Sequence, residues 1–143
     1  MPTRTASAKW EGGLKTGRGS YKGATGLSGQ YDFSSRFESG PGSNPEELLA
    51  AAHAACFSMA LSGALEKNGT PPTSIATTAN CTIEKVGEGF TITKMRLSVT
   101  AIVPKIDDAT FQKVAAGAKD GCPVSRALKG NVDIQLEAKV QSA

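Results

Sequence analysis

Hydrophobic and polar positions divide the chain into segments of period two and segments of helical period. Residues 1–40 are glycine-rich, with aromatic residues set among polar ones, which is typical of short strands and turns. In the stretch QYDFSSRFE, the aromatic residues Tyr31, Phe33 and Phe37 alternate with polar residues that include Arg36. This period-two pattern predicts a strand with one aromatic face and one charged face.

The longest helical pattern begins after this region. Asn44 is a preferred N-cap residue, Pro45 suits the first helical position, and Glu47 stands where a capping box needs its acid. Gly69, followed closely by two prolines, ends the pattern, so we expect a helix from Pro45 to Asn68. The middle of this helix is apolar on nearly every side, which predicts burial all round.

Residues 74–103 predict a hairpin, because two alternating segments flank the turn sequence GEG. The apolar phase of the second segment changes midway, so we expect a β-bulge near Thr93 and Lys94. Residues 106–121 show a short amphipathic helical pattern, and CPVSRALKG adds a further helical turn or two. Residues 131–141 alternate cleanly and predict a last strand.

The order of these elements is β-β-β-α-β-β-α-α-β, which predicts an α+β fold with an antiparallel sheet. The length suits one domain, so we treat residues 1–143 as a single domain. A long helix that is apolar all round needs more cover than one half-exposed sheet supplies. A second copy of the chain would supply the missing wall, so we expect an obligate homodimer.

Composition narrows the classes of partner and compartment. The net charge is +3 and the basic residues are scattered along the chain. Nucleic-acid binding needs a clustered basic patch, so we expect no nucleic-acid partner. The uncharged run from Leu48 to Leu65 is near the lower limit of about 18 residues for a membrane-spanning helix. It is rich in alanine and contains His53, so we expect a helix buried in protein and no membrane. The first residues lack an apolar segment like that of a signal peptide, which favours the cytoplasm, where thiols stay reduced.

The three cysteines and the one histidine carry the candidate chemistry. They could form a Cys3His zinc site, since His53 and Cys56 lie one helical turn apart, but Cys81 and Cys122 are isolated and no CxxC pair nucleates a site. Cys81 falls on the apolar face of a strand, where a thiol usually acts as a small hydrophobic residue. Cys122 opens a helical turn in GCPVS, where the helix dipole favours a thiolate, although a simple cap residue fits the same position.

Cys56 lies in AAAHAACFSMALSG, the most apolar stretch of the chain. Burial among alanines raises the pKa of a thiol and makes it inert unless a cation is brought to it. Arg36 is the candidate cation, and a solvated surface arginine is the alternative explanation of that residue.

The sequence RFESGPGSNPEELLAAAHAACFSMALS, together with GCPVS about 60 residues later, closely resembles the OsmC branch of the OsmC/Ohr family of bacterial thiol peroxidases. KWEGGLKTGRG and GFTITKMRL also look like that branch, so the resemblance covers nearly the whole chain. It implies an α+β fold in which antiparallel sheets wrap around long central helices in an intertwined homodimer, with active sites at the subunit interface.

The resemblance also implies a chemistry, the reduction of hydroperoxides and above all of organic ones. Cys56 would attack the peroxide and become a sulfenic acid, and Cys122 would resolve it as an intramolecular disulfide. Arg36 would stabilise the thiolate and the leaving oxygen, and Glu46 would orient Arg36. A small dithiol or a lipoylated protein would restore both thiols, so no metal or bound cofactor is expected.

Three points stay open at this level. Glu46 and Cys56 are ten residues apart, about 15 Å on a straight helix, so both can face one guanidinium only if the helix breaks or Glu46 comes from the other subunit. Local signals make Cys122 the more acidic thiol, although the resemblance assigns the attack to Cys56. His53 could act as an acid, but a satisfied core residue explains it better.

Two other functions use the same residues. A redox sensor or disulfide-exchange module would employ Cys56 and Cys122 without turnover, and a structural dimer would use the thiols to bind zinc. We also expect an apolar pocket of alanine, leucine, Phe57 and Met59, which would suit a lipid-like hydroperoxide better than hydrogen peroxide.

Overall fold

The computed structural model describes residues 1–142, which form two compact units. The first unit is Met1–Leu48 and the second begins at Leu49. Strands and helices occur in segregated runs, which confirms the predicted α+β class. The expectation of a single domain over residues 1–143 stays a prediction.

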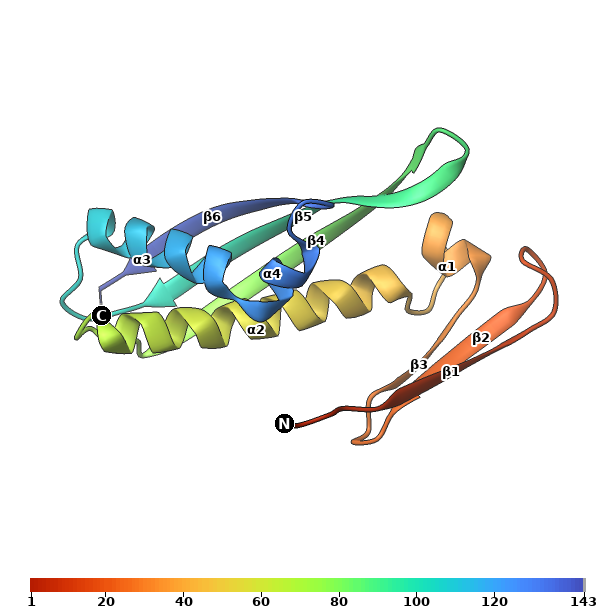
Figure 1. Ribbon diagram of the computed structural model, residues 1–143, viewed down its shortest axis with the longest axis horizontal. Helices are drawn as coiled ribbons and strands as arrows, with labels where there is room; N and C mark the ends of the chain where they lie inside the picture. Colours follow the sequence, from red (N-terminus) through yellow and green to blue (C-terminus); the bar gives the residue numbers. More distant parts are fainter. Residues whose placement is uncertain (143) are drawn as a thin grey trace. The chain divides into compact units, whose positions relative to one another are not determined.

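The first unit begins with a three-stranded antiparallel sheet, as the glycine-rich pattern predicts (Figure 1). Gly19 stands between Trp10 and Tyr31 in the register of this sheet. A side chain at Gly19 would collide with both rings, so glycine lets them approach to 5.5 Å between centroids. The strands, in sheet order, are β1 (Ala6–Glu11), β2 (Arg18–Gly23) and β3 (Ser28–Tyr31).

The prediction of a strand that contains Arg36 is wrong, because the chain forms the short helix α1 (Phe33–Phe37) there. Asp32 caps this helix: its carboxylate accepts the backbone N–H of Ser35, and the Ser35 hydroxyl accepts the N–H of Asp32 in return. This reciprocal capping box outweighs the alternation of aromatic and polar residues. The phenylalanines at the two ends of α1 share one side of the helix, since four residues separate them, and their ring centroids are 5.0 Å apart.

The long helix α2 (Pro45–Lys67) ends one residue before its predicted end, and Gly69 follows with a φ of 84°. The Asn44 side chain accepts the backbone N–H of Glu47, as expected of an N-cap residue. The Glu47 carboxylate accepts the hydroxyl of Ser43. The N-cap is therefore confirmed, whereas the acid of the predicted capping box binds a neighbouring side chain instead.

The predicted hairpin is confirmed in the second unit as β4 (Ser74–Val86) and β5 (Gly89–Ile102). Its register shifts between Thr82 and Ile83, so that Thr93 becomes the extra residue of a β-bulge. The bulge lies where the change of apolar phase predicts it. It keeps the apolar side chains of both halves of β5 in step with those of β4.

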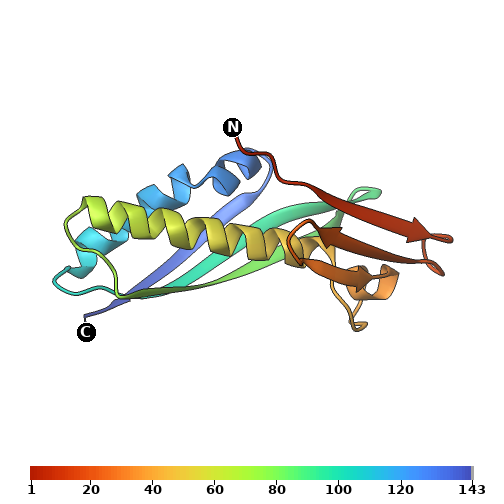
Figure 2. The same cartoon turned by 90° about the horizontal axis from the view of Figure 1, so that it is seen from below.

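The last three elements form as predicted, as α3 (Asp108–Gly121), α4 (Pro123–Leu128) and β6 (Asp133–Gln141). The prediction of an antiparallel sheet is wrong for this unit, because β6 pairs parallel to β5 in the order β4-β5-β6. The connection from β5 to β6 passes through two helices, and such a crossover returns the chain in the same direction. Figure 2 shows α2 and α3 on one face of this sheet.

The core of the second unit lies between this face and one stripe of α2. The stripe consists of His53, Phe57, Leu61 and Leu65, which recur every four residues and are fully buried. The other buried apolar side chains come from β5, from α3 and from the residues that follow them, namely Met95, Leu97, Val99, Ala101, Val103, Phe111, Ala115, Ala118 and Cys122.

Burial of α2 on all sides, expected from its composition, does not occur within one chain. Ala51, Ala52 and Ala55 are exposed on the opposite side, and Met59 has 80% of its surface open to solvent. The helix is also long and apolar enough to cross a membrane. Of its most apolar 18 residues, 22% are buried within the chain. Core helices of soluble proteins meet the same criterion, so length and composition alone are weak evidence for a membrane span.

Replacement of Leu61 by alanine should lower the free energy of unfolding by about 2–5 kcal/mol, since it leaves a cavity between α2 and the sheet. Urea denaturation at a fixed protein concentration measures this loss. The exposed substitution Glu66→Ala on the same helix is the control and should change stability by less than about 0.5 kcal/mol. Equal losses in the two variants would contradict the placement of the core.

Candidate active site

Two of the predicted site residues, Cys56 and Cys122, lie in contact. Cys56 is half-buried on α2, and Cys122 is fully buried at the junction of α3 and α4. The Cys122 thiol donates a hydrogen bond to Cys56, with 2.9 Å between the two Sγ atoms. A disulfide needs about 2.05 Å between its sulfurs, so only a small approach separates this pair from a covalent bond.

The surroundings of Cys56 hold its thiol protonated. Burial, and after it the hydrogen bond with Cys122, raise the pKa of Cys56 above its ordinary value of 9.0. The backbone N–H of Val124 opposes this and lowers the pKa of Cys56. Because the thiolate and not the thiol is the nucleophile, Cys56 needs a cation beyond these neighbours to react at neutral pH.

Cys122 occupies the N-cap position of α4, as the sequence predicts, with Pro123 at the first helical position. In the described chain its thiol makes no capping hydrogen bond, because the S–H is directed at Cys56. The Cys122 side chain therefore contacts α2 and does not cap its own helix.

Arg36 and Glu46 form the second predicted pair, within the first unit. Arg36 Nε donates a hydrogen bond of 3.0 Å to Oε1 of the Glu46 carboxylate, and Arg36 Nη2 forms an ion pair with the same oxygen at 2.9 Å. The Glu46 side chain is almost completely buried, whereas the Arg36 side chain is 35% exposed. A buried acid thus fixes one edge of a guanidinium whose remaining surface reaches solvent.

Two hydrogen bonds place α1 beside the beginning of α2. The Ser35 hydroxyl donates to the carbonyl of Ser43 at 2.8 Å, and the Asn44 amide donates to the carbonyl of Ser35 at 2.8 Å. Asn44 therefore caps α2 and binds α1 at once. This arrangement brings Arg36 to Glu46 across the ten residues that separate them in the sequence.

An aromatic cavity of about 230 Å³ lies beside Arg36 in the first unit. The Phe37 ring stacks against the guanidinium, with 5.0 Å from Cζ to the ring centroid. The cavity is lined by Trp10, Leu14, Tyr31, Asp32, Phe33, Arg36 and Phe37.

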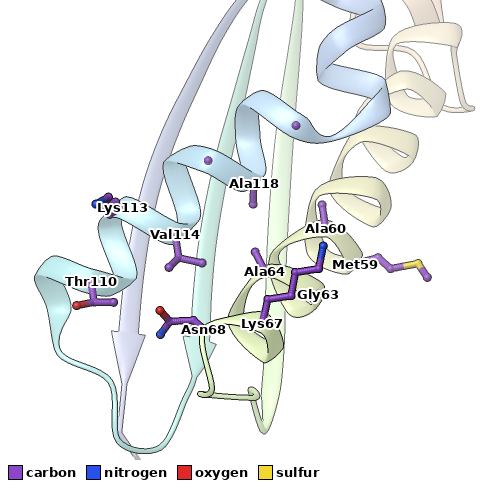
Figure 3. Close-up of a pocket in the computed structure, with 12 residues that line it drawn as sticks. Met59, Ala60, Gly63, Ala64, Lys67, Asn68, Thr110, Lys113, Val114 and Ala118 are labelled. Atoms are coloured by element: carbon purple, nitrogen blue, oxygen red, sulfur yellow. The ribbon is translucent and has the colours of Figure 1, made fainter.

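Within residues 1–142 of a single chain, Phe57 and Met59 do not line one apolar pocket as expected. Phe57 is fully buried in the core, whereas Met59, two residues further on, points to the other side of α2. Met59 instead borders a groove of about 800 Å³ between α2 and α3. Figure 3 shows this groove, with Ala60 and Ala64 of α2 opposite Val114 and Ala118 of α3.

His53 is fully buried one turn before Cys56, as a core histidine would be. Its Nε2 lies 2.7 Å from the hydroxyl of Ser125 on α4. Within residues 1–142 its other ring nitrogen, Nδ1, has no hydrogen-bond partner, so only half of the imidazole is satisfied. Burial lowers the pKa of His53 below 6.5, which keeps the ring neutral at physiological pH.

The zinc alternative gains no geometric support. Within the part of the chain that the structure describes, no group of three His, Cys, Asp or Glu side chains could hold a metal ion. Cys81 lies half-buried on β4 and packs against the core, as its strand pattern predicts.

Glu46 and Cys56 belong to one uninterrupted helix, because α2 runs from Pro45 to Lys67 without a break. Of the two arrangements that would let both serve one guanidinium, a broken helix is thereby excluded. The other arrangement, in which Glu46 comes from a second subunit, stays a prediction.

Sequence reasoning missed two participants in the contact between α2 and α4, namely Ser125 and the backbone of Val124. The signal for Ser125 was present, since His53 and Cys56 are three residues apart and so are Cys122 and Ser125. When two helical turns face each other, two pairs of residues with the same spacing can both come into contact. No side-chain pattern could indicate the backbone N–H of Val124.

The sequence and the fold are similar to those of known proteins. A family model described as OsmC-like protein matches residues 38–137. The chain is 47% identical over 138 residues to peroxiredoxin OsmC of Escherichia coli strain K12, with 95% of this chain and 96% of that protein covered. It is 36% identical over 101 residues to organic hydroperoxide resistance protein OhrB of Bacillus subtilis strain 168, with 68% and 71% covered. The crystal structure of OhrB from Bacillus subtilis matches with a TM-score of 0.74 and 28% identity, covering 94% of this chain and 98% of that one.

The buried neutral His53 should make the protein less stable in mild acid. The unfolded chain takes up a proton near the ordinary value of 6.5, whereas folded His53 takes it up only at lower pH, so stability falls as pH drops below 6.5. Urea denaturation at about pH 7.5 and about pH 5.5 measures this difference, and His53→Gln should reduce it. A variant that loses as much stability as the wild type over this interval would contradict the assignment.

Proposed function

Since this chain belongs to the OsmC/Ohr family, we propose that it is a thiol-dependent peroxidase that reduces organic hydroperoxides to alcohols. The observation that carries the proposal is the 2.9 Å contact between Cys56 and Cys122, which presents a nucleophile and a resolving thiol together. The named relatives include a peroxiredoxin and organic hydroperoxide resistance proteins, which support a peroxidase role. The proposed role is defence against oxidative and osmotic stress, and the names of the relatives fit a stress response in general.

The proposed reaction has three balanced steps. The Cys56 thiolate attacks the distal oxygen of the hydroperoxide, the O–O bond breaks, and the alkoxide takes a proton to leave as alcohol. The Cys122 thiol then attacks the resulting sulfenic acid, forming the Cys56–Cys122 disulfide and releasing water. A small dithiol or a lipoylated protein reduces this disulfide, is itself oxidised, and restores both thiols.

Arg36 is the proposed source of the positive charge that Cys56 requires. Its guanidinium would stabilise the thiolate and the negative charge that develops on the leaving oxygen. Glu46 would hold the guanidinium through the bonds to Nε and Nη2. The buried environment that raises the pKa of Cys56 supports the need for such a charge.

A homodimer would complete this site. The continuity of α2 supports an arrangement in which Arg36 and Glu46 of one subunit serve Cys56 of the other. The exposed apolar side of α2, together with Met59, supports a second copy as its cover. The small residues that line the groove between α2 and α3 would allow another helix to approach closely.

The aromatic cavity beside Arg36 supports an organic substrate over hydrogen peroxide, because it offers apolar surface to the organic group. The need for a thiol reductant supports the cytoplasm as the compartment. Bound metal or cofactor, nucleic acid and membrane have no part in the proposed reaction.

The two cysteines should fail in different ways when replaced. Cys56→Ser should abolish peroxide consumption, since no nucleophile remains. Cys122→Ser should consume about one equivalent of cumene hydroperoxide and stop, since the sulfenic acid has no resolving thiol. Stopped-flow mixing of reduced protein with one to several equivalents of peroxide, followed by mass spectrometry, measures both results.

The wild type with excess dithiothreitol is the control for this experiment and should turn over many times. A single round of consumption by the wild type would favour a redox sensor over an enzyme. A single round by Cys56→Ser and none by Cys122→Ser would reverse the two roles.

Mixed dimers should reveal which subunit supplies Arg36. Subunits that carry Arg36→Gln are inactive, as are subunits that carry Cys56→Ser, but a hybrid has one complete site if Arg36 serves the partner. Equal amounts, mixed under conditions of subunit exchange, should recover about a quarter of the wild-type activity. Absence of recovery in verified hybrids would place Arg36 and Cys56 of one subunit in one site.

A further inference from the structure

Two side-chain contacts join the same two helical turns, one from α2 and one from α4. Cys56 meets Cys122 with 2.9 Å between the sulfurs, and His53 meets Ser125 with 2.7 Å between Nε2 and Oγ. All four residues belong to the second unit. Figure 1 shows α4 beside the middle of α2, where these contacts lie.

The spacing of the four residues makes the two contacts parts of one arrangement. His53 precedes Cys56 by three residues, and Cys122 precedes Ser125 by three. The first residue of each turn meets the last residue of the other, so the two turns run antiparallel. A bond between His53 and Ser125 therefore fixes both the distance and the register of Cys122 against Cys56. The six-residue helix α4 is otherwise held by apolar packing of Val124 and Leu128 against the core, which is less directional than a hydrogen bond.

The imidazole contributes little else to this position. His53 is fully buried, and no group in residues 1–142 bonds its Nδ1, which is unfavourable for a buried polar atom. A leucine would fill similar space without an unsatisfied nitrogen. Among residues 1–142, the bond from Nε2 to Ser125 is therefore the specific contact that a histidine adds here.

We propose that His53 and Ser125 are positioning residues, which hold Cys122 against Cys56 and thereby favour formation of their disulfide. This proposal rests on the redox role proposed above for the two cysteines. The hydrogen bond orders α4 before the sulfurs join, so less freedom is lost when the disulfide forms. Ser125 makes no direct contact with Cys56 in the attack on peroxide, so loss of its bond should slow disulfide formation more than sulfenic acid formation.

A glutathione redox equilibrium tests the proposal without any peroxide. In this equilibrium the thiols of Cys56 and Cys122 and one oxidised glutathione give the protein disulfide and two reduced glutathiones. Ser125→Ala should lower the equilibrium constant roughly ten- to hundredfold, the size of effect expected when reacting groups lose their alignment. His53→Leu, which removes the same bond from α2, should give a loss of the same size and keeps the test valid if one variant folds poorly.

Two matched variants distinguish positioning from a general loss of packing. Ser125→Thr keeps the hydroxyl, and a neighbouring cavity of about 330 Å³ leaves room for its methyl group, so it should behave like the wild type. Ser58→Ala removes a similar hydrogen bond of 2.7 Å, between α2 and Thr77 of β4, and should leave the equilibrium unchanged. An unchanged equilibrium constant in Ser125→Ala, or an equal loss in Ser58→Ala, would overturn the proposal.

The peroxide reaction supplies a second readout. Rapid quenching of the reaction with cumene hydroperoxide separates sulfenic acid formation from disulfide formation by mass. Ser125→Ala should slow the second step more than the first, and its longer-lived sulfenic acid should be oxidised to sulfinic acid at lower peroxide concentration. A wild type that equilibrates with glutathione but consumes no hydroperoxide would refute the proposed function, and the glutathione result would still decide the role of Ser125.

Discussion

The stripe of α2 that packs on the sheet determines where every other part of that helix points. His53, Phe57, Leu61 and Leu65 enter the core at intervals of four, so the residues between them fall at fixed angles around the axis. Cys56 stands next to this stripe, which makes it half-buried and brings it under α4. The alanines on the far side are left without cover in a single copy. One packing requirement thus accounts for the protonated thiol, its neighbour Cys122, and the apolar surface offered to a second subunit.

Much of the fold is predictable because its signals are local. The end of α2 shortly before Gly69 follows from backbone preference, and the bulge at Thr93 follows from the phase of apolar residues. The short helix α1 was missed because aromatic residues four apart satisfy a helix as well as a strand, and the polar capping contacts decided between them. The parallel pairing of β6 was missed because side-chain alternation carries no information about direction. The helices before β6 did carry that information.

The candidate site was less accessible to pattern reasoning. Composition alone indicates that Cys56 is a small residue that fills space in a buried helix. The prediction that it pairs with Cys122 came from resemblance to a family. The contact between Arg36 and Glu46 depends on a turn that folds α1 back on α2, which no periodicity reveals. Ser125 escaped notice because a serine in a short helix has many ordinary explanations. Its meaning emerges only when the position of His53 in space is known.

The way in which Glu46 holds Arg36 limits which residue could take the place of that arginine. A guanidinium is a rigid plane with five N–H donors, and Glu46 engages one edge of it through Nε and Nη2. The opposite edge keeps the pair of donors on Nη1 in a known orientation relative to the buried carboxylate. Lysine has the same charge, but its three N–H donors rotate on one flexible nitrogen, so binding the acid does not fix the direction of the others. The site therefore depends on the shape of the cation as well as on its charge.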